Sequence, residues 1–207
     1  MRHVTWLRTV GACLLLGSLA AAAAQRDVTV AGVIETLEPL PEGAPLRVGV
    51  HLVNPGGVWG REVGGGVPTV TDQGLTFRVV VAGEVTELLP FRSGEVSLPG
   101  LQDAYSVAPE GARVARAVVS VYLDENASGT FDRGTDTPYG GVAMVTSPTG
   151  FFNLLYVDRD VVVAPSKGGE LEFRAGWNLF TARFPEDGEP EYAVSASLDD
   201  VLLSVAP

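Results

Sequence analysis

The sequence predicts an all-β protein, built as an antiparallel β-sandwich of about ten strands with little helix. Apolar and polar residues alternate with the period of a β-strand in most segments after residue 26. Turn-forming residues separate these segments, since the 207-residue chain contains 25 Gly and 14 Pro. No amphipathic pattern long enough for a stable helix accompanies them, so an α/β fold is not expected.

In the first half of the chain, apolar residues alternate most clearly in Leu46–Val53, where Arg47, Gly49 and His51 occupy the other side. This pattern is typical of a half-buried strand, and it places His51 on the solvent side. The segment Asn54–Pro68 is rich in glycine and is expected to form a loop. Strands are expected over Asp27–Glu35, Leu46–Val53, Leu75–Val81, Val85–Phe91 and Glu95–Leu98.

In the second half, residues 99–112 form the longest irregular connection. We expect one domain over residues 25–207, with a division into two smaller sandwiches near 99–112 as the alternative. Residues 197–200 carry Ser and Asp and are compatible either with the last hairpin or with the start of a short helix. Strands are expected over Arg113–Leu123, Gly141–Ser147, Phe151–Val157, Val161–Ala164, Trp177–Phe184, Tyr192–Ala196 and Val201–Val205.

Residues 1–24 have the pattern of an export signal. Arg2 and Arg8 precede an apolar run that ends in Ala22-Ala23-Ala24, the small residues that signal peptidase requires. The mature chain is therefore expected to be periplasmic or extracellular, and not an integral membrane protein. Its single cysteine, Cys13, lies within the signal, so no disulfide stabilises the domain.

The charge balance excludes one class of partner. The whole chain has a net charge of −11, and the expected mature chain is more acidic because the signal removes two arginines. Electrostatic binding to nucleic acid requires a basic surface, so no nucleic-acid partner is expected. An unidentified envelope protein or polysaccharide is the expected kind of partner.

The stretch Val118–Asp136 has the only spacing that indicates specific chemistry. Asp124, Asn126 and Ser128 stand at positions 1, 3 and 5 of a loop with Gly129 at position 6. The Thr130 carbonyl at position 7 and Asp132 at position 9 complete an alternation of oxygen ligands that suits Ca²⁺. An ion-free polar hairpin is the alternative, because turns use the same residue types.

The segment DENASGTFD after VSVYLD resembles the EF-hand-like calcium loops of extracellular bacterial β-sandwich modules. The resemblance covers about a dozen residues and implies a structural calcium held by Asp124, Asn126, Ser128, Thr130 and Asp132. The sequence departs from the pattern at position 12, where Thr135 replaces the closing Glu and Asp136 follows one residue later. Asp136 is therefore included as a candidate ligand. The opening strand and the segment TVTDQGLTF also resemble transthyretin-like accessory modules, which implies an Ig-like or transthyretin-like sandwich.

Other chemistry has little support in the sequence. His51 is the only histidine after the signal and cannot form a zinc site alone. Trp59, in the glycine-rich segment, is expected either to pack on the scaffold or to stack on a ligand. No nucleophile or phosphate-binding motif occurs, so no catalytic residue is assigned. Glycosidases use two carboxyl groups, and four pairs of acidic residues are candidates for that role: Asp158/Asp160, Glu170/Glu172, Glu186/Asp187 and Asp199/Asp200.

Two functions remain open. The first is an exported, non-enzymatic, calcium-stabilised β-sandwich module with a binding or structural role in the cell envelope or outside the cell. The alternative is a secreted carbohydrate-active enzyme that uses one of the carboxylate pairs.

Overall fold

The all-β class predicted from the sequence is confirmed by a computed structural model that describes residues 26–37, 45–93, 95–98, 101, 105–166 and 169–206. Within these ranges the chain forms fifteen strands and no helix. The predicted export signal, residues 1–24, lies outside the described residues. Nothing in the described ranges is a helix of the length and apolar character needed to cross a membrane.

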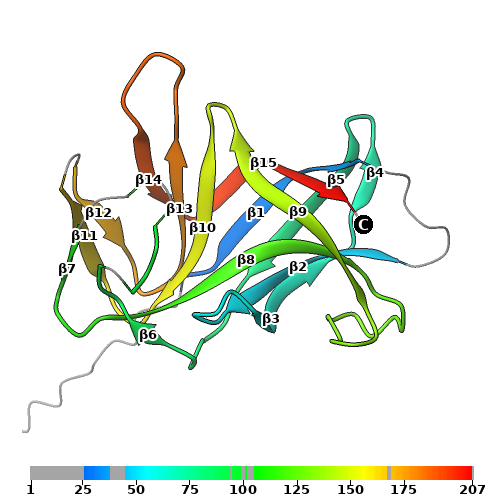
Figure 1. Cartoon of the computed structure of the whole chain (residues 1–207), viewed down its shortest axis with the longest axis horizontal. Coiled ribbons are helices and arrows are strands. Elements are labelled where there is room, and N and C mark those ends of the chain that lie inside the picture. Colours follow the sequence, from blue (N-terminus) through cyan, green and yellow to red (C-terminus); the bar gives the residue numbers. More distant parts are fainter. Residues whose placement is uncertain are drawn as a thin grey trace, which may run out of the picture.

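Figure 1 shows the order and placement of the strands in the described ranges. They are β1 Val28–Thr36, β2 Leu46–Val53, β3 Trp59–Gly66, β4 Thr69–Thr71, β5 Gly74–Val81, β6 Leu89–Pro90, β7 Tyr105–Ala108, β8 Arg113–Leu123, β9 Thr137–Thr146, β10 Thr149–Val157, β11 Val161–Pro165, β12 Leu171–Phe173, β13 Gly176–Arg183, β14 Glu191–Ser195 and β15 Ser197–Ala206.

Strand β8 is the point at which the large sheet divides. Strand β2 pairs along its whole length with one edge of β8, from Leu46 opposite Leu123 to Val53 opposite Arg116. The other edge pairs with β10 near the start of β8 and with β9 near its end. The β9–β10 hairpin therefore opens over β8, and its two strands lead into different branches of the sheet (Figure 1).

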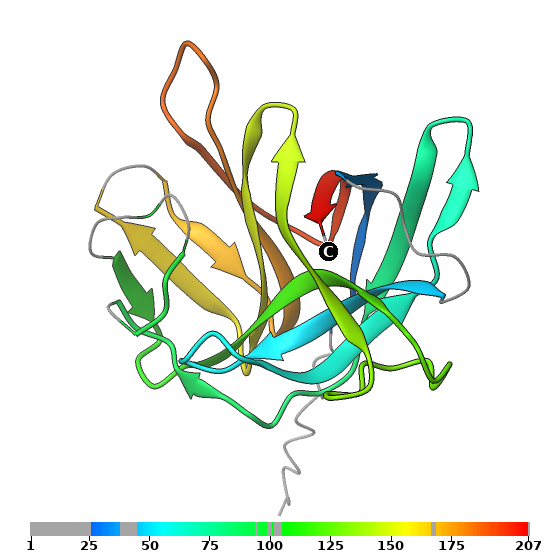
Figure 2. The ribbon, with the colours of Figure 1, turned by 45° about the vertical axis from the view of Figure 1, so that its right-hand side comes forward.

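The two ends of the described chain meet in one of these branches, which runs β9-β15-β1-β5-β4. Strands β1 and β15 pair in parallel, with Thr29 opposite Ser197 and Thr36 opposite Val205. Figure 2 shows the blue β1 and the red β15 side by side. The expectation of a purely antiparallel sheet is therefore wrong at this pair. A parallel pair needs a long connection, and here nearly the whole chain supplies it.

Two hydrophobic cores share the middle of the sheet. Strands β10 and β13 direct alternate residues to opposite faces, so Leu154 and Leu179 lie in the larger core and Leu155 and Phe180 in the smaller one. The smaller core is covered by a separate three-stranded sheet, β12-β11-β7. Strand β7 comes from the segment near 99–112, of which residues 99, 100 and 102–104 are outside the described ranges. The number of domains stays a prediction.

Five local expectations need correction. The segment Val85–Phe91 is a strand only at Leu89–Pro90, and Glu95–Leu98 forms no strand. The segment Asn54–Pro68 is not a loop throughout, because β3 pairs with β2. Its glycines allow this strand to approach β5, since a Cβ on Gly64 would stand 2.8 Å from the Val80 carbonyl oxygen. Residues 197–200 begin β15 and do not form a helix. The described residues contain fifteen strands rather than about ten, because several pairings involve only two to four residues, as in β4, β6, β7 and β12.

Candidate metal loop and its aromatic anchor

The predicted metal loop leaves the end of β8 and returns into β9. Asp124 directly follows β8 and is buried, with 2% of its surface exposed. Gly129, at the sixth position, has a φ of +84°, which a glycine adopts without the steric cost of a Cβ. The backbone therefore turns sharply at the sixth position of the loop.

Hydrogen bonds link the odd-numbered positions of the loop to one another. The two carboxylate oxygens of Asp124 accept the amides of Ser128 and Gly129, each at 2.9 Å. The Asn126 amide nitrogen donates to Asp132 Oδ2 at 2.8 Å, and the Ser128 hydroxyl donates to the Thr130 carbonyl at 2.7 Å. The five residues from Asp124 to Asp132 that were predicted as ligands therefore lie together.

Asp136 has a different place in the loop. Its Oδ1 accepts the amide of Glu125 at 3.0 Å, and its Oδ2 accepts the amide of Asp132 at 2.7 Å. Only 6% of the residue is exposed. Asp136 thus ties the beginning of the loop to its end. The structure shows no hydrogen bond between Asp136 and the side chains of Asn126 or Ser128, among the residues it describes.

The chemistry of this set is that of a hard-cation ligand group with few charges. Two carboxylates are accompanied by an amide, a hydroxyl and a backbone carbonyl, all oxygen donors of the kind Ca²⁺ accepts. No group of three or more Asp, Glu, His or Cys side chains with metal-binding geometry occurs in the described part of the chain. Asn126 hydrogen bonds hold the pKa of Asp132 below its ordinary value, with a second contribution from Ser128, so its carboxylate is ionised at neutral pH.

Phe131 anchors the loop to the outer face of the sheet. Its ring lies edge-on to three others, with centroid distances of 5.3 Å to Tyr122, 5.5 Å to His51 and 5.5 Å to Trp59. The Phe131 amide donates to Glu62 Oε2 at 2.9 Å. Two residues later, Arg133 donates to the carbonyl of Trp59 at 2.8 Å. The loop is therefore attached to β2, β3 and β8 through side chains as well as through the backbone.

His51 is not the surface residue that the alternating pattern of β2 predicted. It is completely buried, because Trp59 and Phe131 cover the face that was expected to meet solvent. Neither ring nitrogen has a hydrogen-bond partner among the described residues. Burial lowers the pKa of His51 to about 4, so the imidazole is neutral at physiological pH. Trp59 is half-buried and packs on the scaffold, which is one of its two expected roles.

Glu62 connects the loop to this aromatic cluster electrostatically. Its Oε2 accepts the Tyr122 hydroxyl at 3.0 Å in addition to the Phe131 amide. Burial raises the pKa of Glu62 above its ordinary value, although both hydrogen bonds and the charge of Arg47 oppose the shift. Arg47 also approaches Asp124, with its Nε 3.8 Å from Oδ2. A part-buried network therefore runs from the sheet face to the first position of the loop.

The four acidic pairs considered for catalysis lie at the surface and are mostly bound to arginines. Arg174 pairs with both Asp160 and Glu172, and Arg183 pairs with Asp200. The Ala175 amide and then Arg174 hold the pKa of Asp160 low, and Arg183 does the same for Asp200. A glycosidase acid requires a carboxyl whose pKa is raised. Asp160 and Asp200 have the opposite shift, which is that of surface ion pairs.

Comparison with known proteins does not assign this chain to a family. No family model matches the chain, and no curated protein or solved structure matches it either. The functional assignment therefore depends on the loop and its surroundings alone. Glu62 and Phe131 carried no signal in the sequence, since they are 69 residues apart along the chain and meet only in the fold.

Proposed function

We propose that this chain is an exported, non-enzymatic module whose β scaffold is stabilised by one Ca²⁺ held in the loop Asp124–Asp132. The observation that supports it is the convergence of Asp124, Asn126, Ser128, Thr130 and Asp132 within one hydrogen-bonded turn. A bound ion would take the place of the polar hydrogens that now satisfy these oxygens. Asp136 would hold the ends of the loop in register rather than ligate.

The proposed role of the ion is structural. The loop covers the outer face of β2, β3 and β8 through Phe131, so an ordered loop keeps His51 and Trp59 packed. Ca²⁺ that binds only the folded chain adds stability by mass action, about 2.7 kcal/mol at a hundredfold excess over its dissociation constant. The module itself is proposed to be a sandwich of Ig-like or transthyretin-like type, because strands from both branches of the curled sheet cover one shared core.

Thermal unfolding with Ca²⁺ and with EDTA tests the ion. We expect the chelator to lower the melting temperature of the wild type and to have no effect on Asp124→Ala. Asp132→Asn keeps the size of a partly exposed side chain while removing its charge, and should weaken Ca²⁺ binding without unfolding the protein. Asp187→Asn, on an exposed turn outside the loop, is the matched control. If the wild type has the same melting temperature in Ca²⁺ and in EDTA, the proposal that the loop binds Ca²⁺ is wrong.

The proposed export and the proposed binding role are tested separately. Mass spectrometry of the protein recovered from the periplasm or the medium should give a chain that begins at Gln25. Retention of residues 1–24 in the mature protein contradicts the export signal. For the binding role, the mature chain is offered envelope protein and polysaccharide fractions with and without Ca²⁺. Saturable binding that the chelator abolishes supports a calcium-ordered binding module.

A further inference from the structure

A pocket of about 450 Å³ lies at the end of β2, away from the acidic loop. Three stretches of the chain form its walls: the β2–β3 turn, the segment leading into β6, and the beginning of β8. Leu52, Leu88, Leu89 and Ala115 supply an apolar surface. The volume falls in the range of pockets that hold small organic molecules. None of its lining residues belongs to the loop Asp124–Asp136, so the pocket is independent of the proposed calcium.

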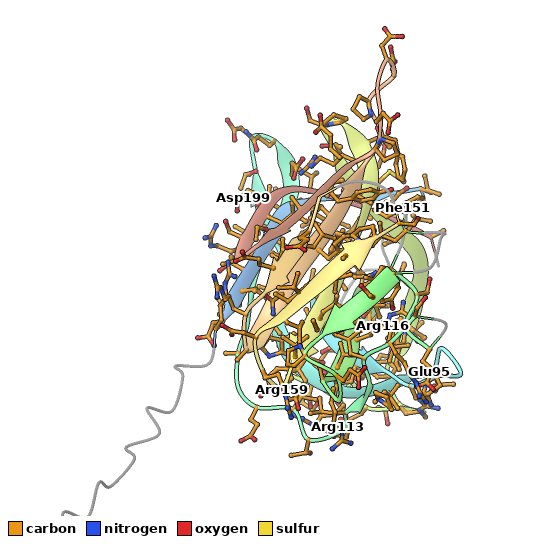
Figure 3. The ribbon with its side chains drawn as sticks, turned by 90° about the vertical axis from the view of Figure 1, so that its left-hand side faces the viewer. Glu95, Arg113, Arg116, Phe151, Arg159 and Asp199 are labelled. Carbon is orange, nitrogen blue, oxygen red and sulfur yellow. The ribbon has the colours of Figure 1, made fainter. Side chains whose placement is uncertain are left out.

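The charge of this pocket is opposite to that of the protein. Arg61, Arg113 and Arg116 line it together with a single acid, Glu87, whereas the chain as a whole has a net charge of −11. Figure 3 shows Arg113 and Arg116 on the part of the molecule away from Asp199 and Phe151. A pocket with positively charged walls on an acidic protein selects for an anionic ligand.

Two of the three arginines are already engaged. Arg61 pairs with Glu87 at 3.4 Å on the exposed rim, and Arg113 donates to the carbonyl of Leu88 through Nη2. Arg116 is half-buried and takes part in none of the ion pairs formed by the described residues. Its Nε is buried without a hydrogen-bond partner in that part of the chain. A guanidinium that is partly withdrawn from water without a counter-charge costs stability, which an anionic ligand would recover.

We propose that this pocket binds a small organic carboxylate with an apolar body. The carboxylate lies against Arg116, whose planar guanidinium matches two carboxylate oxygens, and the apolar body lies against Leu88 and Leu89. A neutral sugar is disfavoured because no aromatic side chain lines the pocket to stack on its ring. Arg113 adds a second positive charge at the same wall.

Calorimetric titration of the mature protein with octanoate at low salt tests the proposal. Acetate carries the charge without the apolar body, and 1-octanol carries the apolar body without the charge. Octanoate is expected to bind saturably, at least about tenfold more tightly than either control probe, and to bind more weakly as salt is added. Octanol that binds as tightly as octanoate, or octanoate that shows no saturable binding, overturns the proposal.

Substitutions then locate the site. Arg116→Gln should weaken octanoate binding by about tenfold, whereas Arg78→Gln, which removes an exposed arginine on β5, should leave the affinity unchanged. Leu89→Asp changes an exposed lining residue and places a negative charge beside the carboxylate, so it too should weaken binding without unfolding the protein. Unchanged affinity in both Arg116→Gln and Leu89→Asp places the octanoate elsewhere and contradicts the assignment.

Discussion

The imidazole of His51 lies flat against the indole of Trp59, with ring centroids 4.9 Å apart and ring planes inclined by 9°. The two residues come from neighbouring strands, β2 and β3. Tyr122 and Phe131 close the remaining sides with edge-on contacts. Because Trp59, Tyr122 and Phe131 exclude water, the only histidine after residue 24 is held in its neutral form.

Stability should therefore fall as the pH falls from about 6.5 to about 4. In this window the unfolded chain binds a proton at His51 and the folded chain does not, because the folded pKa is lowered to about 4. The shift corresponds to about 3 kcal/mol of lost folding free energy. The pKa of Glu62 is raised, so protonation of Glu62 stabilises the folded state as the pH falls and opposes part of this loss.

Urea unfolding across a pH series separates the two groups. His51→Phe keeps an aromatic ring against Trp59 and removes the titrating nitrogen, while Glu62, Tyr122 and Arg47 stay in both proteins. The difference in unfolding free energy between wild type and variant should change by about 3 kcal/mol between pH 7 and pH 4. Parallel curves would show that His51 has an ordinary pKa and is not enclosed.

Phe131 should contribute more to stability than an exposed phenylalanine does. Phe131→Ala removes the ring that contacts His51, Trp59 and Tyr122, and is expected to lower the unfolding free energy by about 2–3 kcal/mol. Phe151→Ala is the control, since that ring is 47% exposed and should cost much less. Equal losses in the two variants, measured by urea unfolding, would mean that the loop is not anchored through Phe131.

The hydrogen-bonding role of Glu62 can be separated from its charge. Tyr122 and Phe131 both donate to the same oxygen, Oε2, so the carbonyl of a glutamine can accept both bonds. Glu62→Ala leaves both donors without this acceptor and should cost about 1–3 kcal/mol. Glu62→Gln should become more stable relative to the wild type as the pH rises from 4 to 8, because ionisation of a carboxyl with a raised pKa costs folding free energy. If Gln and Ala destabilise equally in urea unfolding, the acceptor role is wrong.

The strand period was sufficient to predict the β class, but not which faces are covered. Alternation in Leu46–Val53 places Arg47, Gly49 and His51 on one side of the strand, and that side usually faces water. Here Phe131 reaches it from a loop that is distant in sequence. The parallel pairing of β1 and β15 was equally inaccessible, since local patterns do not say which distant segments meet.

The loop was predictable to the extent that its interactions are local. The spacing of Asp124, Asn126, Ser128 and Asp132 encodes bonds between residues at most eight positions apart, and the structure brings them together as expected. Asp136 accepts two backbone amides, as Asp124 does, and the amides that it joins, at Glu125 and Asp132, were not predictable from the spacing. Glu62 was not identified, since a single glutamate in a glycine-rich segment has no distinguishing pattern.

Gly176 should be the least replaceable glycine at the start of a strand. It has a φ of +97°, and a Cβ added there would stand 2.6 Å from the Arg26 backbone nitrogen. Next to it, the Trp177 amide donates to the Arg26 carbonyl at 2.9 Å, which fastens the beginning of the described chain to β13. An alanine must therefore accept both a strained backbone and a displaced neighbour.

Gly74→Ala supplies the matched comparison, because Gly74 has a φ of +100° with no atom within 4 Å of the added Cβ. Both variants incur the backbone cost of about 1–2 kcal/mol, and Gly176→Ala should lose clearly more. Thermal unfolding measures the difference, and proteolysis near Arg26 should accelerate only in Gly176→Ala. Equal melting temperatures would mean that the contact between Arg26 and β13 contributes nothing to the fold.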